Sequence, residues 1–125
     1  MDFEKLYNIA FEQINHPQYK TRKPTGFIGA VLCTDKGNIY TGICEENVTS
    51  LEVCAERIAA TEMIKHGETK VIMMISVNID GEVVAPCKDC RTFIGQLDDD
   101  NLQTEVFLAK DQSLTLKELL PLTWQ

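Results

Sequence analysis

The positions of apolar side chains along the first third of the chain predict one helix followed by a pair of strands. Residues 3–14 repeat apolar side chains at helical spacing, and Asp2 stands in front of them as a helix-capping residue. Two short apolar runs follow at 27–33 and 39–44, and the turn sequence Asp35-Lys36-Gly37-Asn38 separates them. The pattern therefore predicts a β-hairpin, and its first strand has the continuous apolar character of a strand buried on both faces.

The rest of the chain alternates between short apolar runs typical of strands and apolar stripes at helical spacing. We expect, in order, a helix ending near His66-Gly67, a central strand at 70–79, a helix opening near Pro86, a solvated loop at 98–101, a strand at 106–109, and a short helix with a capping box at Thr115–Glu118.

This order of elements, α-β-β-α-β-α-β-α, predicts an α/β fold, a three-layer αβα sandwich with helices on both faces of one sheet. Strands separated by helices should run parallel, and the first two should pair as an antiparallel hairpin, so we expect a mixed sheet. The chain has 125 residues and no internal repeat, low-complexity tract or linker. We therefore expect a single domain spanning residues 1–125.

Composition and charge narrow the class of partner. The chain is 44% hydrophobic and 25% charged, and its net charge of -7 disfavours nucleic acids and anionic membranes as partners. No apolar run approaches the roughly 18 residues of a membrane span, and the acidic start of the chain is unlike a signal peptide. Five cysteines, an odd number, favour reduced thiols. We expect a cytoplasmic protein with a small, uncharged substrate.

Two short segments concentrate groups that bind metals. Cys54-Ala55-Glu56-Arg57 carries one thiol and one carboxylate, and Pro86-Cys87-Lys88-Asp89-Cys90-Arg91 carries two thiols at the C-x-x-C spacing common in zinc sites. A catalytic zinc ion takes three protein ligands and keeps its fourth position open for water. Because Cys54, Cys87 and Cys90 supply that number of ligands, the residues predict a zinc site that activates water.

The spacing within the first segment also locates the start of its helix. Residues i and i+2 do not face each other on a regular helix, so Cys54 and Glu56 approach one metal only at the N-terminal end of that helix. We therefore expect the helix to begin close to Val53 or Cys54, and we discount the capping-box sequence Thr49-Ser50-Leu51-Glu52 as its boundary. Both metal-binding segments then open helices, whose N-terminal N–H groups favour negative charge.

Residues beside the thiols suggest further roles. Ala59 and Ala60 lie one turn after Glu56, so the carboxylate of Glu56 leans over a small apolar face and can carry protons between water and substrate. Three thiolates on one Zn²⁺ ion leave a net negative charge. Arg57 and Arg91 could offset that charge by donating hydrogen bonds to the sulfur atoms, and the alternative for both is an ordinary place on the surface.

These segments, together with Tyr40-Thr41-Gly42 and Glu118-Leu119-Leu120-Pro121, resemble the cytidine deaminase family. The similarity runs from about Gly29 to Trp124. It implies a cytidine-deaminase-like αβα domain with Zn²⁺ as its cofactor, a nucleoside as its substrate, and assembly as a homotetramer, with a homodimer as the alternative.

The resemblance also assigns the reacting residues. Cys54, Cys87 and Cys90 match the zinc ligands, and Glu56 matches the proton shuttle. The implied reaction is attack of zinc-activated water on C4 of the pyrimidine, protonation of N3 by Glu56 and release of ammonia.

Substrate contacts follow from the same resemblance. The N–H of Ala55 would hold the base carbonyl. Cys44 stands where the family has an asparagine, and Trp124 stands where it has an aromatic residue that reaches a neighbouring subunit. The expected substrate-binding residues are therefore Cys44, Glu46, Ala55, Phe27 and Trp124.

Several functions remain open at this point. The first is deamination of cytidine or deoxycytidine in pyrimidine salvage. The second is the same reaction on another cytosine-containing compound, because blasticidin S deaminases are similarly short and share the cysteine-alanine-glutamate motif. The others are a structural zinc module, in which Cys44 closes the site with a fourth thiolate, and a thiol redox protein that uses Cys87 and Cys90.

Overall fold

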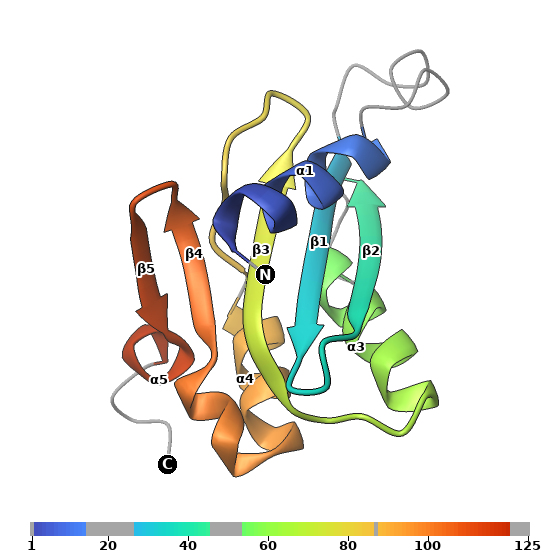
Figure 1. Ribbon diagram of the computed structural model, residues 1–125, viewed down its shortest axis with the longest axis vertical. Helices are drawn as coiled ribbons and strands as arrows, with labels where there is room; N and C mark the ends of the chain where they lie inside the picture. Colours follow the sequence, from blue (N-terminus) through green and yellow to red (C-terminus); the bar gives the residue numbers. More distant parts are fainter. Residues whose placement is uncertain (1, 15–26, 46–53, 87, 121–125) are drawn as a thin grey trace.

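A five-stranded mixed sheet forms the centre of the computed structural model, which describes residues 2–14, 27–45, 54–86 and 88–120 (Figure 1). In their order across the sheet, the strands are β2 (Ile39–Glu45), β1 (Phe27–Thr34), β3 (Val71–Asn78), β4 (Glu105–Ala109) and β5 (Gln112–Thr115).

Helices cover both faces of this sheet, which confirms the predicted αβα layering. The helices are α1 (Phe3–Ile14) on the first face, α3 (Ala55–Lys65) and α4 (Lys88–Leu97) on the second, and the short η1 (Asp99–Gln103) and α5 (Leu116–Leu119) near the C-terminal end. Figure 1 shows α1 in front of the sheet and α3 and α4 behind it. None of the helices in the described ranges is both long enough and apolar enough to span a membrane.

The strand directions agree with the prediction from the sequence. β1 pairs antiparallel with both β2 and β3, so β2 and β3, which α3 connects, run in the same direction. β3 pairs in parallel with β4 after the crossover through α4. The prediction missed β5, which pairs antiparallel with β4. Three residues of its sequence, Gln112-Ser113-Leu114-Thr115, are polar and the strand is partly exposed, so it lacks the apolar run by which the other strands were found.

The central strands divide the core into two layers, and alternation of side chains assigns each residue to one of them. Odd-numbered residues of β1 and β3, such as Val31 and Ile75, pack with α1. Even-numbered residues, such as Leu32 and Met74, pack with α3, α4 and α5. This alternation decides which side chains of the sheet can reach the start of α3.

The stretch 98–101 was predicted to be a solvated loop, and this is wrong for Asn101, which is fully buried in η1. Its side-chain oxygen accepts a hydrogen bond from the Val71 N–H at 2.8 Å. Its amide nitrogen donates to the carbonyl oxygens of Thr69 and Ile94 at 2.8 and 2.9 Å. A buried amide needs such partners. Asn101 therefore connects the last turn of α4 to the start of β3.

Glu68 fastens the C-terminal end of α3 to the β1–β2 hairpin. Its Oε2 atom accepts hydrogen bonds from the Tyr40 hydroxyl at 2.6 Å and from the Asn38 side-chain amide at 2.8 Å. These bonds lower the pKa of Glu68, and the bond to Glu68 raises the pKa of Tyr40 to about 12. One end of α3 is thereby held against the sheet.

Candidate active site

Two thiols and one carboxylate of the predicted site come together where α3 and α4 begin. One sulfur each from Cys54 and Cys90 and one carboxylate oxygen of Glu56 all lie within 4.8 Å of one another. Glu56 and Cys90 are 4% and 1% exposed, and Cys54 is half-buried. Because thiolates are preferred zinc ligands, this donor set fits a zinc ion. Cys87, the third predicted ligand, lies outside the described residues.

The first turn of α3 begins where the predicted chemistry requires. Cys54 is the N-cap residue, with an extended backbone, and its side chain makes no capping hydrogen bond. Its carbonyl oxygen accepts hydrogen bonds from the N–H groups of Arg57 and Ile58, both at 3.0 Å. The predicted helix start close to Val53 or Cys54 is therefore confirmed. The capping-box sequence at 49–52 lies outside the described residues.

The sheet beneath this turn carries three small residues at one level. Gly42 of β2 pairs with Ala30 of β1, and Ala30 pairs with Ser76 of β3. We call these three residues the small-residue row. A β-carbon at Gly42 would collide with the carbonyl oxygen of Ala55, so a glycine is needed for α3 to approach β2 this closely. The small-residue row lets the first turn of α3 lie directly on the sheet.

Glu56 makes a hydrogen bond to this row. The hydroxyl of Ser76 donates to Oε2 of Glu56 at 2.5 Å, and Ser76 is only 1% exposed. Ser76 was not predicted as a site residue, because it lies within the apolar run that predicted β3. The available signal was one hydroxyl between Ile75 and Val77 in a strand otherwise expected to be apolar.

The two arginines that follow key residues have different surroundings. The guanidinium carbon of Arg57 lies 4.1 Å from the centre of the Phe93 ring, so a cation–π contact joins α3 to α4. Nε of Arg91 is buried and has no hydrogen-bond partner within the described ranges. The residue next to Cys90 therefore has a hydrogen-bond donor that is available to a further partner. The hydrogen bonds to sulfur suggested for both arginines stay predictions.

The residues predicted to contact substrate fall on different faces of the sheet. Cys44 lies two positions after Gly42 on β2, so it faces α3, and it does not belong to the three-residue cluster found among the described residues. Phe27 lies two positions before Gly29, which faces Ala10 of α1, so Phe27 lies on the opposite face from Glu56. Its predicted contact with substrate stays a prediction.

Three predicted site residues cannot be placed, because they lie outside the described ranges: Glu46, Cys87 and Trp124. Ala55, in contrast, is the first residue of α3 and is fully buried. The N–H groups in the first turn of a helix have no partner within the helix. The predicted use of the Ala55 N–H as a hydrogen-bond donor to substrate is consistent with this position.

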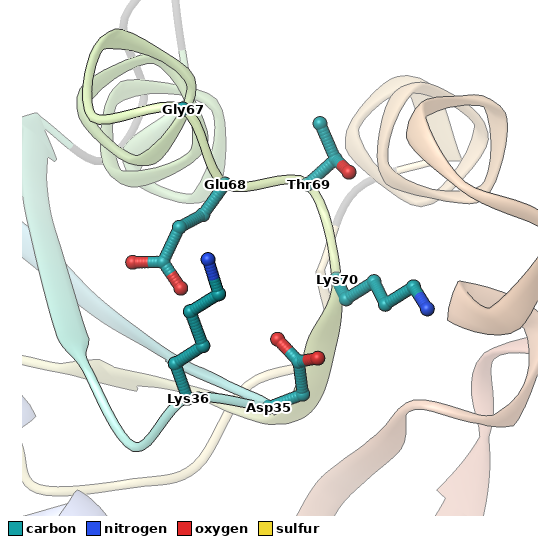
Figure 2. A pocket seen from close by; sticks show the side chains of 6 residues that line it. All are labelled: Asp35, Lys36, Gly67, Glu68, Thr69 and Lys70. Atoms are coloured by element: carbon teal, nitrogen blue, oxygen red, sulfur yellow. The ribbon is translucent and has the colours of Figure 1, made fainter.

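A polar hollow of about 260 Å³ lies at the opposite end of α3 (Figure 2). Its lining residues are Asp35, Lys36, Gly67, Glu68, Thr69 and Lys70. Two of its charged side chains already have partners, since Glu68 binds Tyr40 and the Lys70 ammonium lies 3.2 Å from Asp100. Figure 2 shows the Lys70 side chain pointing away from the ring of lining residues. We therefore do not assign the reaction to this hollow.

Comparison with known proteins points to one family. Residues 2–106 match the family model described as the cytidine and deoxycytidylate deaminase zinc-binding region. A curated relative from Dictyostelium discoideum, a probable cytidine deaminase, is 33% identical over 128 residues, which cover 97% of this chain and 84% of the relative.

Solved structures show the same fold. The crystal structure of cytidine deaminase from Mycobacterium tuberculosis matches with a TM-score of 0.78 and 23% identity, over 100% of this chain and 98% of that one. The cytidine deaminase from Burkholderia pseudomallei matches with a TM-score of 0.72 and 25% identity, over 99% and 100% of the two chains.

Proposed function

Because the chain belongs to the cytidine and deoxycytidylate deaminase family, we propose that it converts cytidine or deoxycytidine to uridine or deoxyuridine and releases ammonia. The family consists of hydrolytic deaminases, so the chain is a hydrolase that acts on the exocyclic C–N bond of a cyclic amidine. The main observation in favour of this reaction is that Cys54, Glu56 and Cys90 lie together at the N-terminal ends of α3 and α4.

Cys54, Cys87 and Cys90 hold the zinc ion in this proposal. The two described thiols support it, since they lie together at the starts of α3 and α4, where backbone N–H groups favour thiolate. When bound by three protein ligands, zinc activates a water molecule as the nucleophile. Arg57 and Arg91 offset the excess negative charge of three thiolates.

Glu56 carries the protons. It accepts a proton from the attacking water and delivers it to N3 of the pyrimidine, and it then transfers the second proton of the water to the exocyclic amine. The C4–N bond breaks, the water oxygen remains on C4, and ammonia leaves. The burial of Glu56 supports this role, because a carboxylate shielded from bulk water keeps its proton available to the substrate.

Substrate recognition is assigned to the residues around this centre. The N–H of Ala55 holds the base carbonyl, and Glu46, Cys44 and Trp124 contact the rest of the substrate. Phe27 lies on the opposite face of the sheet from Glu56 and does not belong to this set. The position of Cys44 on the α3 side of β2 supports its part in this set.

A second candidate substrate is blasticidin S or another cytosine-containing compound. The observation that favours it is again Cys44, because a thiol is a poor hydrogen-bonding group and faces the side of the sheet on which α3 begins. A closed structural zinc site is less well supported. Within the described residues, the cluster contains the carboxylate of Glu56 and not the thiol of Cys44.

Ammonia release from a substrate panel tests the proposal. The purified zinc-loaded protein is incubated with cytidine, deoxycytidine, cytosine and blasticidin S. We expect turnover of at least one of the two nucleosides. Turnover of blasticidin S alone would select the second candidate, and absence of turnover with four sulfur ligands by X-ray absorption would select the structural zinc module.

We also propose that residues 1–125 form a single domain and that the protein is a cytoplasmic homotetramer, with a homodimer as the alternative. Three large apolar side chains are exposed on the described surface: Ile58 and Ile64 of α3, and Ile72 of β3, at 37%, 39% and 42%. Exposed apolar side chains on one helix support a contact between subunits.

A further inference from the structure

The hydrogen bond from Ser76 to Glu56 links β3 to the residue that carries protons in the proposed reaction. Ser76 Oγ and Glu56 Oε2 are 2.5 Å apart, and both residues are buried. A carboxylate only accepts hydrogen bonds, so the serine hydroxyl is the donor. The bond therefore occupies one of the two carboxylate oxygens.

The surroundings of Ser76 show why a hydroxyl at this position is informative. Met74, two positions earlier on the same face of β3, is fully buried in the core layer shared with α3. Ile75 and Val77, on either side in the sequence, are buried in the α1 layer. Position 76 therefore stands among buried apolar residues. A buried hydroxyl is unfavourable without a partner, and Glu56 is that partner.

The small-residue row makes this contact possible. Ala30 is paired with Ser76, and Gly42 is paired with Ala30, so neither β1 nor β2 places a bulky side chain beside Ser76 at this level of the α3 face. Glu56 can extend from the first turn of α3 down to the sheet and meet the hydroxyl there.

We propose that Ser76 is a positioning residue for Glu56, an inference that rests on the proposed deamination. By holding Oε2, the Ser76 hydroxyl keeps the carboxylate in one orientation and leaves its other oxygen to exchange protons with the base and the amine. Ser76 itself does not touch the substrate.

The reason that this matters is geometric. A glutamate side chain has several rotatable bonds, and proton transfer requires it to lie within hydrogen-bond reach of the reacting atoms. Without the Ser76 bond, the protein should still fold and bind zinc, but the Glu56 carboxylate can adopt orientations that do not react. The rate of the chemical step should fall, while binding of substrate and metal should not.

Steady-state kinetics of Ser76→Ala and Ser76→Thr test the proposal on whichever substrate the wild type deaminates. We expect kcat of Ser76→Ala to fall by about 10- to 100-fold, the size of a misplaced reacting group, with unchanged KM, zinc content and unfolding temperature. Ser76→Thr retains the hydroxyl and should recover most of kcat. The matched control is Ser113→Ala, because Ser113 donates to Glu105 at 2.8 Å between β4 and β5 and should leave kcat unchanged.

Wild-type kcat in Ser76→Ala would overturn the inference, and so would a loss of activity that only follows a loss of zinc or of folded protein. The proposed function and the role of Ser76 fail in different ways. A wild-type protein that deaminates nothing in the panel refutes the proposed function, whereas an active wild type with an equally active Ser76→Ala variant refutes only the role of Ser76.

Discussion

At the scale of single residues, the proposed role of Glu56 predicts that turnover can be lost while metal binding is kept. Glu56→Gln keeps the size of the side chain but removes its capacity to accept and return a proton. We expect turnover to fall by about 10²- to 10⁴-fold, the usual size of general acid–base catalysis, while zinc content by elemental analysis is retained. The matched control is Glu62→Gln on the exposed side of α3. An active Glu56→Gln variant would remove Glu56 from the mechanism.

Glu68 gives a prediction about stability and pH. Hydrogen bonds from Tyr40 and Asn38 lower its pKa below the ordinary value of 4.5. A carboxylate with a lowered folded-state pKa stabilises the protein above its unfolded-state pKa, and this stabilisation is lost as the pH falls through the folded-state pKa. We therefore expect the free energy of unfolding, measured with denaturant from pH 7 to pH 3, to fall more steeply in the wild type than in Glu68→Gln.

The quantity compared is the difference in free energy of unfolding between the wild type and Glu68→Gln at each pH. Loss of zinc at low pH affects both proteins and cancels in this difference. We expect the stability advantage of the wild type to be constant above about pH 5 and to shrink below it. An advantage that stays constant down to pH 3 would show that Glu68 does not contribute through its charge.

The site residues that belong to a recognisable metal-binding motif were predicted from the sequence, and those outside such a motif were not. Cys54, Glu56 and Cys90 stand in a motif whose spacing requires them to meet, and the structure brings them together. Ser76 and Asn101 carry no such pattern, because a serine in an apolar run and an asparagine after three aspartates look like ordinary strand and loop residues. Their roles depend on contacts with residues 20 positions away or more, such as Glu56 for Ser76 and Val71 for Asn101.

At the scale of elements, Gly42 sets the distance between β2 and α3. A methyl group at this position would meet the backbone of Ala55 and Ala59, which are rigid neighbours. Gly42→Ala should therefore displace the first turn of α3 from the sheet, lower the free energy of unfolding by about 1–3 kcal/mol, and reduce turnover through the displaced Cys54 and Glu56.

Chemical denaturation and the substrate assay check this prediction together. Thr41→Ala is the control, since Thr41 neighbours Gly42 on β2 but its side chain is exposed. A Gly42→Ala protein with wild-type stability and turnover would contradict the close approach of α3 to the strand.

The elements themselves were largely predictable, since each long apolar run or helical stripe produced the expected strand or helix. The start of α3 was found only because metal geometry overruled the capping-box pattern in front of it. β5 and η1 were missed for a physical reason. Their stability comes from pairing with β4 and from the buried Asn101, which are tertiary contacts that local pattern does not contain.

At the scale of the whole molecule, the sheet has a narrow seam between β3 and β4. Only two residue pairs join these strands in the described sheet, Met73 with Glu105 and Met74 with Val106, whereas β1 pairs with β3 along its length. Cys54 caps α3, which packs on β1 and β2, and Cys90 lies in α4, which packs on η1 and α5 as well as on α3. A zinc ion held by both cysteines would add a further connection across the seam.

Removal of zinc should therefore weaken the association of β4 and β5 with the rest of the sheet. A ligand at 100 times its dissociation constant contributes about 2.7 kcal/mol to the stability of the folded state. We expect a chelator to lower the unfolding temperature and to speed amide hydrogen exchange in β4 and β5. Cys54→Ser, which removes one ligand, should respond little to the chelator; an equal response would place the metal elsewhere.

The crossover from α3 through β3 to α4 has a consequence for how the protein is made. Every described residue assigned to metal binding or proton transfer lies between Cys54 and Arg91, and the donor to Glu56 is on the strand that joins the two helices. These residues leave the ribosome before β4 and β5, which complete the sheet. The described residues of the centre are therefore encoded as one consecutive block of the chain, and the last two strands of the sheet are synthesised only after all of them.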